Sequence, residues 1–240
     1  MDTLKSIARS AMLEYNLEPD FPLEVSSELR SLEHRASMEQ AGIRDLRTLL
    51  WCSIDNDDSR DLDQLTVAEP LTDGARVLIA IADVDAVVPP TSAIDAHARH
   101  NTTSVYTAAQ IFPMLPERLS TDLTSLNPGE ERLALVVDMR VSASGALVGA
   151  EVYRARVHSK AKLAYNSVAV WLDGAASVHE GVKSVAGLDA QLRLQHAMAE
   201  SMRQRRRTQG ALNLETVQSR PVFRDEFLTD LRADEANSAT

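Results

Sequence analysis

The stretch RLALVVDMRVSASGALVGAEVYRARVHS, residues 132–159, limits the possible folds of this chain more than any other. It contains two long runs rich in β-forming residues, and the polar segment SASG joins them. Two such runs separated by a short turn are typical of a β-hairpin. The sequence therefore predicts an antiparallel or mixed sheet that contains this hairpin.

Helices and further strands surround the hairpin in an irregular order. Apolar runs predict strands at residues 49–54, 65–69, 75–84, 215–223 and 227–231. Helical spacing predicts helices at residues 3–16, 24–42, 92–101, 167–174 and 187–209. Ser92 is the expected N-cap of one helix, and Ser120 is expected to cap another short helix. This order indicates an α+β fold with helices flanking the sheet, and not a regular βαβ alternation.

Composition places the chain among ordinary globular proteins. Hydrophobic residues make up 44% and charged residues 25%, which excludes disordered and fibrous classes. The lone Cys52 excludes a disulfide framework and a cysteine-based zinc site. No apolar run reaches the roughly 18 residues of a membrane span, and the N-terminus lacks the layout of a signal peptide. We therefore expect a cytoplasmic protein with no membrane partner.

Two regions are expected along the chain. Residues 1–47 predict a short, charged, helical N-terminal segment, and residues 48–240 predict the main domain. The chain has no strong stop at its end, so we expect the main domain to be incomplete at its C-terminus.

Net charge gives an ambiguous indication of the partner. The value of −10 argues against a nucleic-acid partner on bulk electrostatics. However, residues 1–120 hold 10 Lys and Arg against 20 Asp and Glu, so the whole excess lies in that half. Bound divalent cations would offset part of this charge. A polyanionic substrate in a local groove is therefore compatible with the composition.

Five aspartates lie within nine residues in the segment IDNDDSRDLDQ. An EF-hand needs Gly at its sixth position and Glu at its twelfth, where this chain has Arg60 and Thr66. Asp61 and Asp63 are two residues apart, so on an extended segment both point to one face, and Asp55 can fold back onto it. Oxygen ligands alone favour Mg²⁺ or Mn²⁺ over zinc. The alternative is a solvated acidic loop with helix-capping aspartates.

Three other side chains are candidates for substrate contact. Tyr106 follows a polar loop, where its ring either packs in the core or stacks on a base. Lys160 and Lys162 alternate beside Leu163, so they face either one groove or water.

Five segments in one order resemble a known family. They are IDNDDSRDLDQ, VLIAIADVDAVV, SAIDAHARHNTTSVY, FPMLPERLSTDLTSLNPGEERLAL and SKAKLAYNSV. Together they resemble the catalytic RNB domain of the ribonuclease II family of exoribonucleases, from about Thr48 to the end of the chain.

This resemblance implies hydrolysis of single-stranded RNA from its 3′ end, with release of nucleoside 5′-monophosphates and with Mg²⁺ held by clustered aspartates. The family's metal-site aspartates match Asp55, Asp61 and Asp63, of which the last is the most critical. The fourth family position is normally Asp and here is Gln64, whose amide oxygen can ligate but brings no charge. The family tyrosine that packs against the terminal nucleotides matches Tyr106.

Two other functions remain open from the sequence. The first is a catalytically weak RNA-binding relative, in which Gln64 or the missing C-terminal part of the domain abolishes turnover. The second is an unrelated Asp-x-Asp metal-dependent enzyme that transfers nucleotidyl or glycosyl groups.

Overall fold

The structure is a computed structural model that describes residues 2–32, 42–212, 218–224 and 227–234. The chain forms two compact units. The first unit comprises residues 1–37, 84–123 and 216–235, and the second comprises residues 38–83, 124–215 and 236–240. Each unit is described on its own below.

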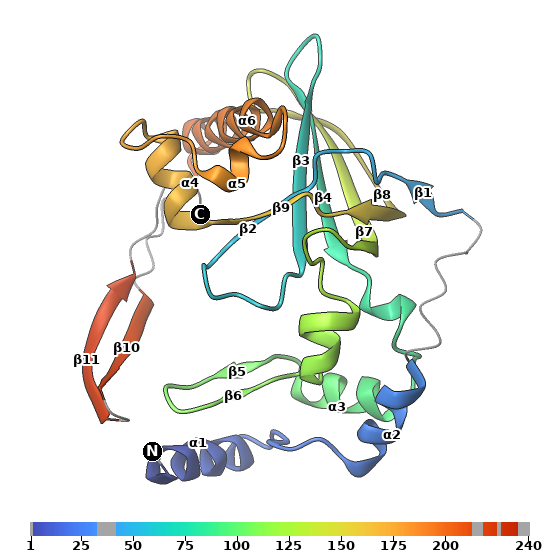
Figure 1. Cartoon of the computed structure of the whole chain (residues 1–240), viewed down its shortest axis with the longest axis vertical. Helices are drawn as coiled ribbons and strands as arrows, with labels where there is room; N and C mark the ends of the chain where they lie inside the picture. The colour runs from blue at the N-terminus through green and yellow to red at the C-terminus, as the bar shows by residue number, and fades with distance from the viewer. Residues whose placement is uncertain (1, 33–41, 213–217, 225–226, 235–240) are drawn as a thin grey trace. The chain divides into compact units, whose positions relative to one another are not determined.

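A seven-stranded mixed sheet forms the second unit (Figure 1). The strands are β1 (Arg44–Asp45), β2 (Cys52–Asp55), β3 (Gln64–Pro70), β4 (Ala75–Ala82), β7 (Glu131–Val141), β8 (Leu147–His158) and β9 (Ala161–Ala164). Their order is β1-β8-β7-β4-β3-β2-β9. The pairs β1–β8 and β2–β9 are parallel, and the other neighbours are antiparallel. The predicted α+β class and mixed sheet are confirmed.

The predicted hairpin is β7–β8, and it extends without interruption from Glu131↔His158 to Arg140↔Gly149. Its turn contains Gly145 at φ 75°, in the left-handed region that favours glycine. A side chain at this position would also overlap the backbone of Ser201 in helix α6 (Leu188–Thr208), since an ideal Cβ would lie 2.3 Å from the Ser201 carbonyl oxygen. The turn therefore combines conformational and packing reasons for glycine.

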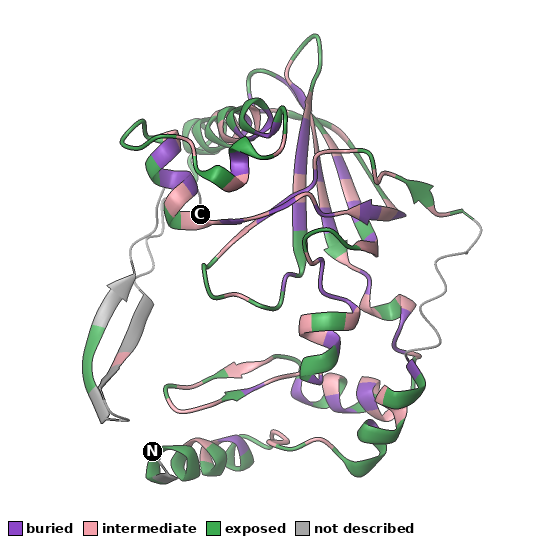
Figure 2. Ribbon diagram, viewed as in Figure 1, coloured by how far each residue is buried: buried purple, intermediate pink, exposed green. Residues whose placement is uncertain are grey.

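A cluster of buried apolar residues packs on the sheet, and buried positions recur along its strands (Figure 2). Trp51, Leu65, Leu78, Val136 and Val157 belong to this cluster and are at most 1% exposed. Burying side chains of this size stabilises the fold by about 1.5–3 kcal/mol each. The core thus fixes the strands from which the acidic loop emerges.

Three helices of the second unit follow β9 in the chain. They are α4 (Tyr165–Leu172), α5 (Glu180–Lys183) and α6. The side chain of Gln191 in α6 accepts a hydrogen bond from the Ala68 amide at 3.3 Å and donates one to the Leu50 carbonyl at 3.0 Å. A buried amide that bonds to both segments fixes α6 against β3 and the chain before β2.

The first unit contains the predicted N-terminal helices, α1 (Asp2–Glu14) and α2 (Leu23–Leu32), together with α3 (Ala93–Asn101). The helix expected at residues 24–42 ends at Leu32, and residues 33–41 lie outside the described part of the chain. Two hairpins complete the unit: β5 (Val105–Tyr106) with β6 (Ile111–Phe112), and β10 (Gln218–Arg224) with β11 (Phe227–Asp234).

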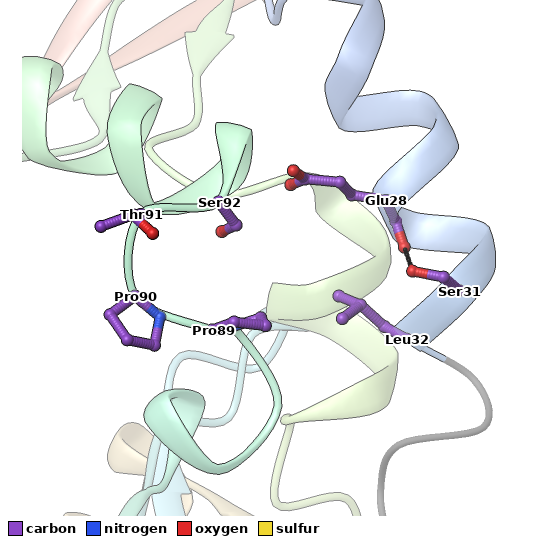
Figure 3. A pocket seen from close by; sticks show the side chains of 7 residues that line it. All are labelled: Glu28, Ser31, Leu32, Pro89, Pro90, Thr91 and Ser92. Carbon is purple, nitrogen blue, oxygen red and sulfur yellow. Dashed lines mark hydrogen bonds between the residues drawn. The ribbon is translucent and has the colours of Figure 1, made fainter.

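Helix α3 has its amino end capped twice. Ser92 is the N-cap, as predicted, and its hydroxyl accepts the Asp95 amide at 3.1 Å. Glu28 of α2 accepts the amides of Ala93 and Ile94 at 2.8 and 3.0 Å, beside a hollow of about 270 Å³ (Figure 3). A carboxylate at this position also interacts favourably with the helix dipole, so α2 and α3 are tied together.

A buried histidine links α3 to the segment that follows α1. His97 Nδ1 lies 3.0 Å from a carboxylate oxygen of Glu18, and Asn101 lies 3.2 Å from His97 Nε2. Asn101 also accepts the Glu18 amide at 2.8 Å and donates to its carbonyl at 2.9 Å. These bonds satisfy a buried polar cluster and dock the N-terminal segment on α3.

The expected capping role of Ser120 is wrong. A helical turn, Leu119–Leu123, contains Ser120, and the amides of Leu119 and Ser120 both bond to the Pro116 carbonyl. Proline is well suited to precede the first hydrogen-bonded turn, and helical geometry therefore begins before Ser120. The Ser120 hydroxyl donates instead to the Glu117 carbonyl at 3.3 Å.

Candidate active site

The acidic loop connects the end of β2 to the start of β3. Asp55 is the last residue of β2, where one oxygen of its carboxylate accepts the Asn56 amide and the Ser59 hydroxyl, each at 2.7 Å. The Ser59 amide donates to the Asn56 carbonyl at 3.2 Å and closes a turn. No helix begins within residues 55–63, so the aspartates of this loop do not cap one.

Leu62 anchors the second half of the loop. Its side chain is 2% exposed, and its backbone amide donates a hydrogen bond to the Ser125 hydroxyl at 3.1 Å. Its carbonyl accepts the Leu126 amide at 2.7 Å. Since alternate side chains of an extended segment point to opposite sides, Asp61 and Asp63 emerge together on the solvent side. The predicted common face of these two carboxylates agrees with this arrangement.

The carboxylates influence one another. Desolvation, together with the negative charges of Asp55 and Asp61, raises the pKa of Asp63 above its ordinary value. The charges of Asp55 and Asp61 thus add to the cost of ionising Asp63, a cost that a bound cation would offset. An all-oxygen donor set with excess negative charge fits a hard divalent cation such as Mg²⁺.

The arrangement does not amount to a complete metal centre. Within the described residues, no three His, Cys, Asp or Glu side chains are grouped as ligands of one ion. Gln64 is exposed, is the first residue of β3 and directly follows the exposed Asp63. Metal binding by Asp55, Asp61, Asp63 and Gln64 stays a prediction.

Tyr165 is a site residue that reasoning from the sequence missed. The parallel pair β2–β9 places Asp55 opposite Ala164, and Tyr165 follows as the first residue of α4. Burial and the negative charges of Asp55 and Asp63 raise the pKa of the Tyr165 phenol. In the sequence, Tyr165 is marked only by its place in the segment SKAKLAYNSV. Its position near Asp55 depends on the parallel pairing of two distant strands, which no local sequence pattern predicts.

The two predicted lysines have different surroundings. The Lys162 ammonium donates to the backbone carbonyls of Asp57 at 3.2 Å and Ser59 at 2.5 Å. Lys160 precedes β9, and its ammonium lies 2.8 Å from Nδ1 of His158. RNA binding by both lysines stays a prediction, and Lys162 lies at the acidic loop itself.

Tyr106 belongs to the first unit, whereas the aspartates belong to the second. In the hairpin β5–β6, Val105 pairs with Phe112 and Tyr106 pairs with Ile111. Phe112 is 2% exposed and Tyr106 is 68% exposed, so the two pairs use opposite faces of the hairpin. The alternative of a buried Tyr106 ring is therefore wrong, and the ring is accessible to a base.

The second unit is thus a mixed sheet with an aspartate-rich loop at the end of one of its strands. The chain belongs to the RNB-domain family, whose family model matches residues 43–240. This membership confirms the family to which the five ordered segments pointed.

Relatives and solved structures agree with this assignment. The chain is 35% identical over 218 residues to ribonuclease R of Vibrio parahaemolyticus, which covers 90% of this chain and 26% of the relative. It is 36% identical over 208 residues to ribonuclease R of Escherichia coli, with 86% and 25% covered. Ribonuclease R of Mycoplasma genitalium, in complex with ribose-methylated single-stranded RNA, has the same fold, with a TM-score of 0.85, 24% identity, and 96% and 36% covered.

The chain spans about a quarter of the length of the curated relatives it matches. Across the described residues, every helix is too short or too polar to cross a membrane. The division at residues 47 and 48 stays a prediction.

Proposed function

We propose that this RNB domain hydrolyses single-stranded RNA from its 3′ end with Mg²⁺ and releases nucleoside 5′-monophosphates. The observation that carries the proposal is the pair Asp61 and Asp63, presented on one side of the segment anchored by Leu62, next to Asp55. The identity to proteins named ribonuclease R supports the choice of RNA as substrate.

The carboxylates of Asp55, Asp61 and Asp63 would hold the metal, with Gln64 as a fourth oxygen donor. When bound, Mg²⁺ activates water and stabilises the leaving 3′ oxygen of a phosphodiester. The aspartates then need no nucleophilic role of their own. Their task is to hold the ion, whose positive charge would attract the RNA phosphate in spite of the negative charge of the loop.

The two tyrosines have separate tasks in this proposal. The Tyr165 phenol is protonated at neutral pH, as an ordinary tyrosine is and as the upward direction of its pKa shift reinforces, so the hydroxyl could donate a hydrogen bond to the RNA. The exposed ring of Tyr106 would stack on a terminal base, which contributes about 1–3 kcal/mol per base. Lys160 would contact phosphate, where each neutralised phosphate increases the salt dependence of binding.

A second candidate function is that of an RNA-binding relative with weak turnover. Gln64 favours it, because the family position normally carries Asp, and so does the lack of three grouped ligands among the described residues. The distinction between the two candidates is catalytic, since both would bind single-stranded RNA.

One experiment separates the candidates. Single-stranded RNA labelled at its 5′ end is incubated with the purified protein, with Mg²⁺ or with EDTA. The proposed function predicts Mg²⁺-dependent ladders and free nucleoside 5′-monophosphate. Intact RNA that migrates as a complex with the protein in a native gel would support the RNA-binding relative. RNA that is neither cleaved nor bound would support a transferase of another class.

A further inference from the structure

Lys162 connects the sheet to the acidic loop. It lies in β9 opposite Ser53 of β2, two residue pairs before the pair that Asp55 forms with Ala164. From there its ammonium donates to the carbonyls of Asp57 and Ser59, which are 105 and 103 residues away in sequence. The edge strand β9 thus holds the backbone of the acidic loop through this side chain.

The bond to Ser59 continues to a predicted ligand. The Ser59 carbonyl accepts the Lys162 ammonium, and the Ser59 hydroxyl donates to the Asp55 carboxylate at 2.7 Å. The orientation of Asp55 therefore depends on the position of Ser59, and the position of Ser59 depends on Lys162. Hydrogen-bonding partners that orient ligands in this way typically change metal affinity or activity by 10- to 100-fold when removed.

The positive charge of Lys162 stabilises the loop, as its hydrogen bonds do. The loop carries five aspartates and one arginine between residues 55 and 63, and carboxylates this close repel one another. An ammonium bound to the loop backbone offsets part of this repulsion. Two of its three N–H donors are engaged by Asp57 and Ser59, which limits what Lys162 can offer to an RNA phosphate.

We propose that Lys162 is a positioning residue, which holds the loop so that Asp55 keeps its place beside Asp63. The catalytic part of this inference rests on the proposed function. The structural part does not, because it concerns the loop in the metal-free protein.

The first test measures the loop directly. Hydrogen exchange of peptides covering residues 55–63 is compared in wild type, Lys162→Met and Lys162→Arg, all in EDTA. Methionine keeps the unbranched apolar stem but removes the donors, so we expect at least tenfold faster exchange in this loop. Arginine restores donors and charge, and we expect it to recover most of the protection. Unchanged exchange in Lys162→Met would overturn the proposal even if the protein proved to have no nuclease activity.

The second test separates positioning from RNA binding. For Lys162→Met we expect kcat to fall about 10- to 100-fold and the half-saturating Mg²⁺ concentration to rise. RNA affinity in EDTA and its salt dependence should stay within twofold of wild type. Lys183→Met is the control, because Lys183 pairs with Glu180 on an exposed surface of α5. Unchanged kcat with weaker, less salt-dependent RNA binding would show that Lys162 is a phosphate ligand instead. An inactive wild type would count against the proposed function and leave the exchange result to decide the role of Lys162.

Discussion

Asp55 and Tyr165 lie at the same end of two neighbouring parallel strands, β2 and β9, and the negative charge of Asp55 raises the pKa of the Tyr165 phenol. Desolvation is the larger cause of this shift, and the charge of Asp63 adds to it. The pKa of this phenol can therefore be used to measure the charge of the acidic loop, even in a protein without enzymatic activity.

We expect Asp55→Asn to lower the pKa of Tyr165 towards its ordinary value, because one of the charges that oppose ionisation is removed. Bound Mg²⁺ should have the same effect in wild type, since it offsets the charges of Asp55 and Asp63. An NMR titration with labelled tyrosine measures both shifts. Asp58→Asn is the control and should change the pKa of Tyr165 less than Asp55→Asn does. If neither Asp55→Asn nor Mg²⁺ changes this pKa, the charge of Asp55 does not act on Tyr165 and the proposed metal site is contradicted.

Asp63→Asn should nearly abolish RNA cleavage. The amide keeps the shape of the side chain but removes the charge that the metal requires, so we expect a loss of at least about 1,000-fold, or about 4 kcal/mol of transition-state stabilisation. RNA binding in EDTA should be preserved, because affinity comes mainly from phosphate contacts elsewhere. Asp58→Asn removes the same charge from the same loop and should stay active. Full activity of Asp63→Asn would refute the proposed site.

Gln64→Asp tests whether the fourth position touches the metal. A carboxylate roughly 8 Å from a divalent ion in water contributes about 1 kcal/mol before screening by salt. For a nearby charge that does not ligate the ion, we expect the half-saturating Mg²⁺ concentration to fall only about two- to fivefold. A decrease of more than tenfold, seen in Mg²⁺ titrations of activity, would instead indicate direct ligation.

Tyr106→Ala should change the end-product more than the initial rate. Loss of stacking corresponds to roughly five- to 150-fold weaker holding per stacked base. Short oligomers depend on stacking most, whereas long RNAs spread their affinity over many phosphates. The variant should therefore release longer remnants, which a denaturing gel resolves. Identical final fragments from both proteins would show that the exposed Tyr106 ring does not hold nucleotides.

Cys52 predicts a loss of stability at alkaline pH. Burial raises the pKa of the Cys52 thiol from 9.0 to about 11, so the unfolded chain releases its proton first as the pH rises. The contribution is fully present below the unfolded pKa and is lost between about pH 9 and 11, at most about 3 kcal/mol. Chemical unfolding at pH 8 and pH 10.5 measures this decrease. Cys52→Ala has a lower stability from its cavity but should show a smaller pH dependence, and equal slopes would rule out the thiol as the cause.

Local patterns predicted those parts of the fold that depend on neighbouring residues. The hairpin β7–β8 and the Ser92 cap need only nearby partners, and both were correctly predicted. The spacing of Asp61 and Asp63 also placed both carboxylates on one side of their segment. Such features are encoded within about 30 residues of sequence or fewer.

Long-range relationships escaped prediction for a physical reason. The parallel pairing of β2 with β9 joins residues more than 100 positions apart, and nothing in either strand specifies its partner. Tyr165 and the role of Lys162 in the loop both depend on that pairing. The start of the turn at Leu119–Leu123 depended on Pro116, whose effect on the following amides outweighed the capping preference of Ser120.

The anchoring of Leu62 by Ser125 has a consequence for synthesis on the ribosome. The aspartates leave the exit tunnel before the groups that hold their loop, because the hydroxyl that holds Leu62 is 63 residues further along the chain and the ammonium that holds Ser59 is 103 residues beyond its partner. A nascent chain that has emerged only as far as β4 carries every predicted carboxylate ligand but neither of these supports. Its acidic segment would sample many conformations and bind metal weakly. Assembly of the site is thus timed to follow the emergence of β9, when most of the sheet is already available.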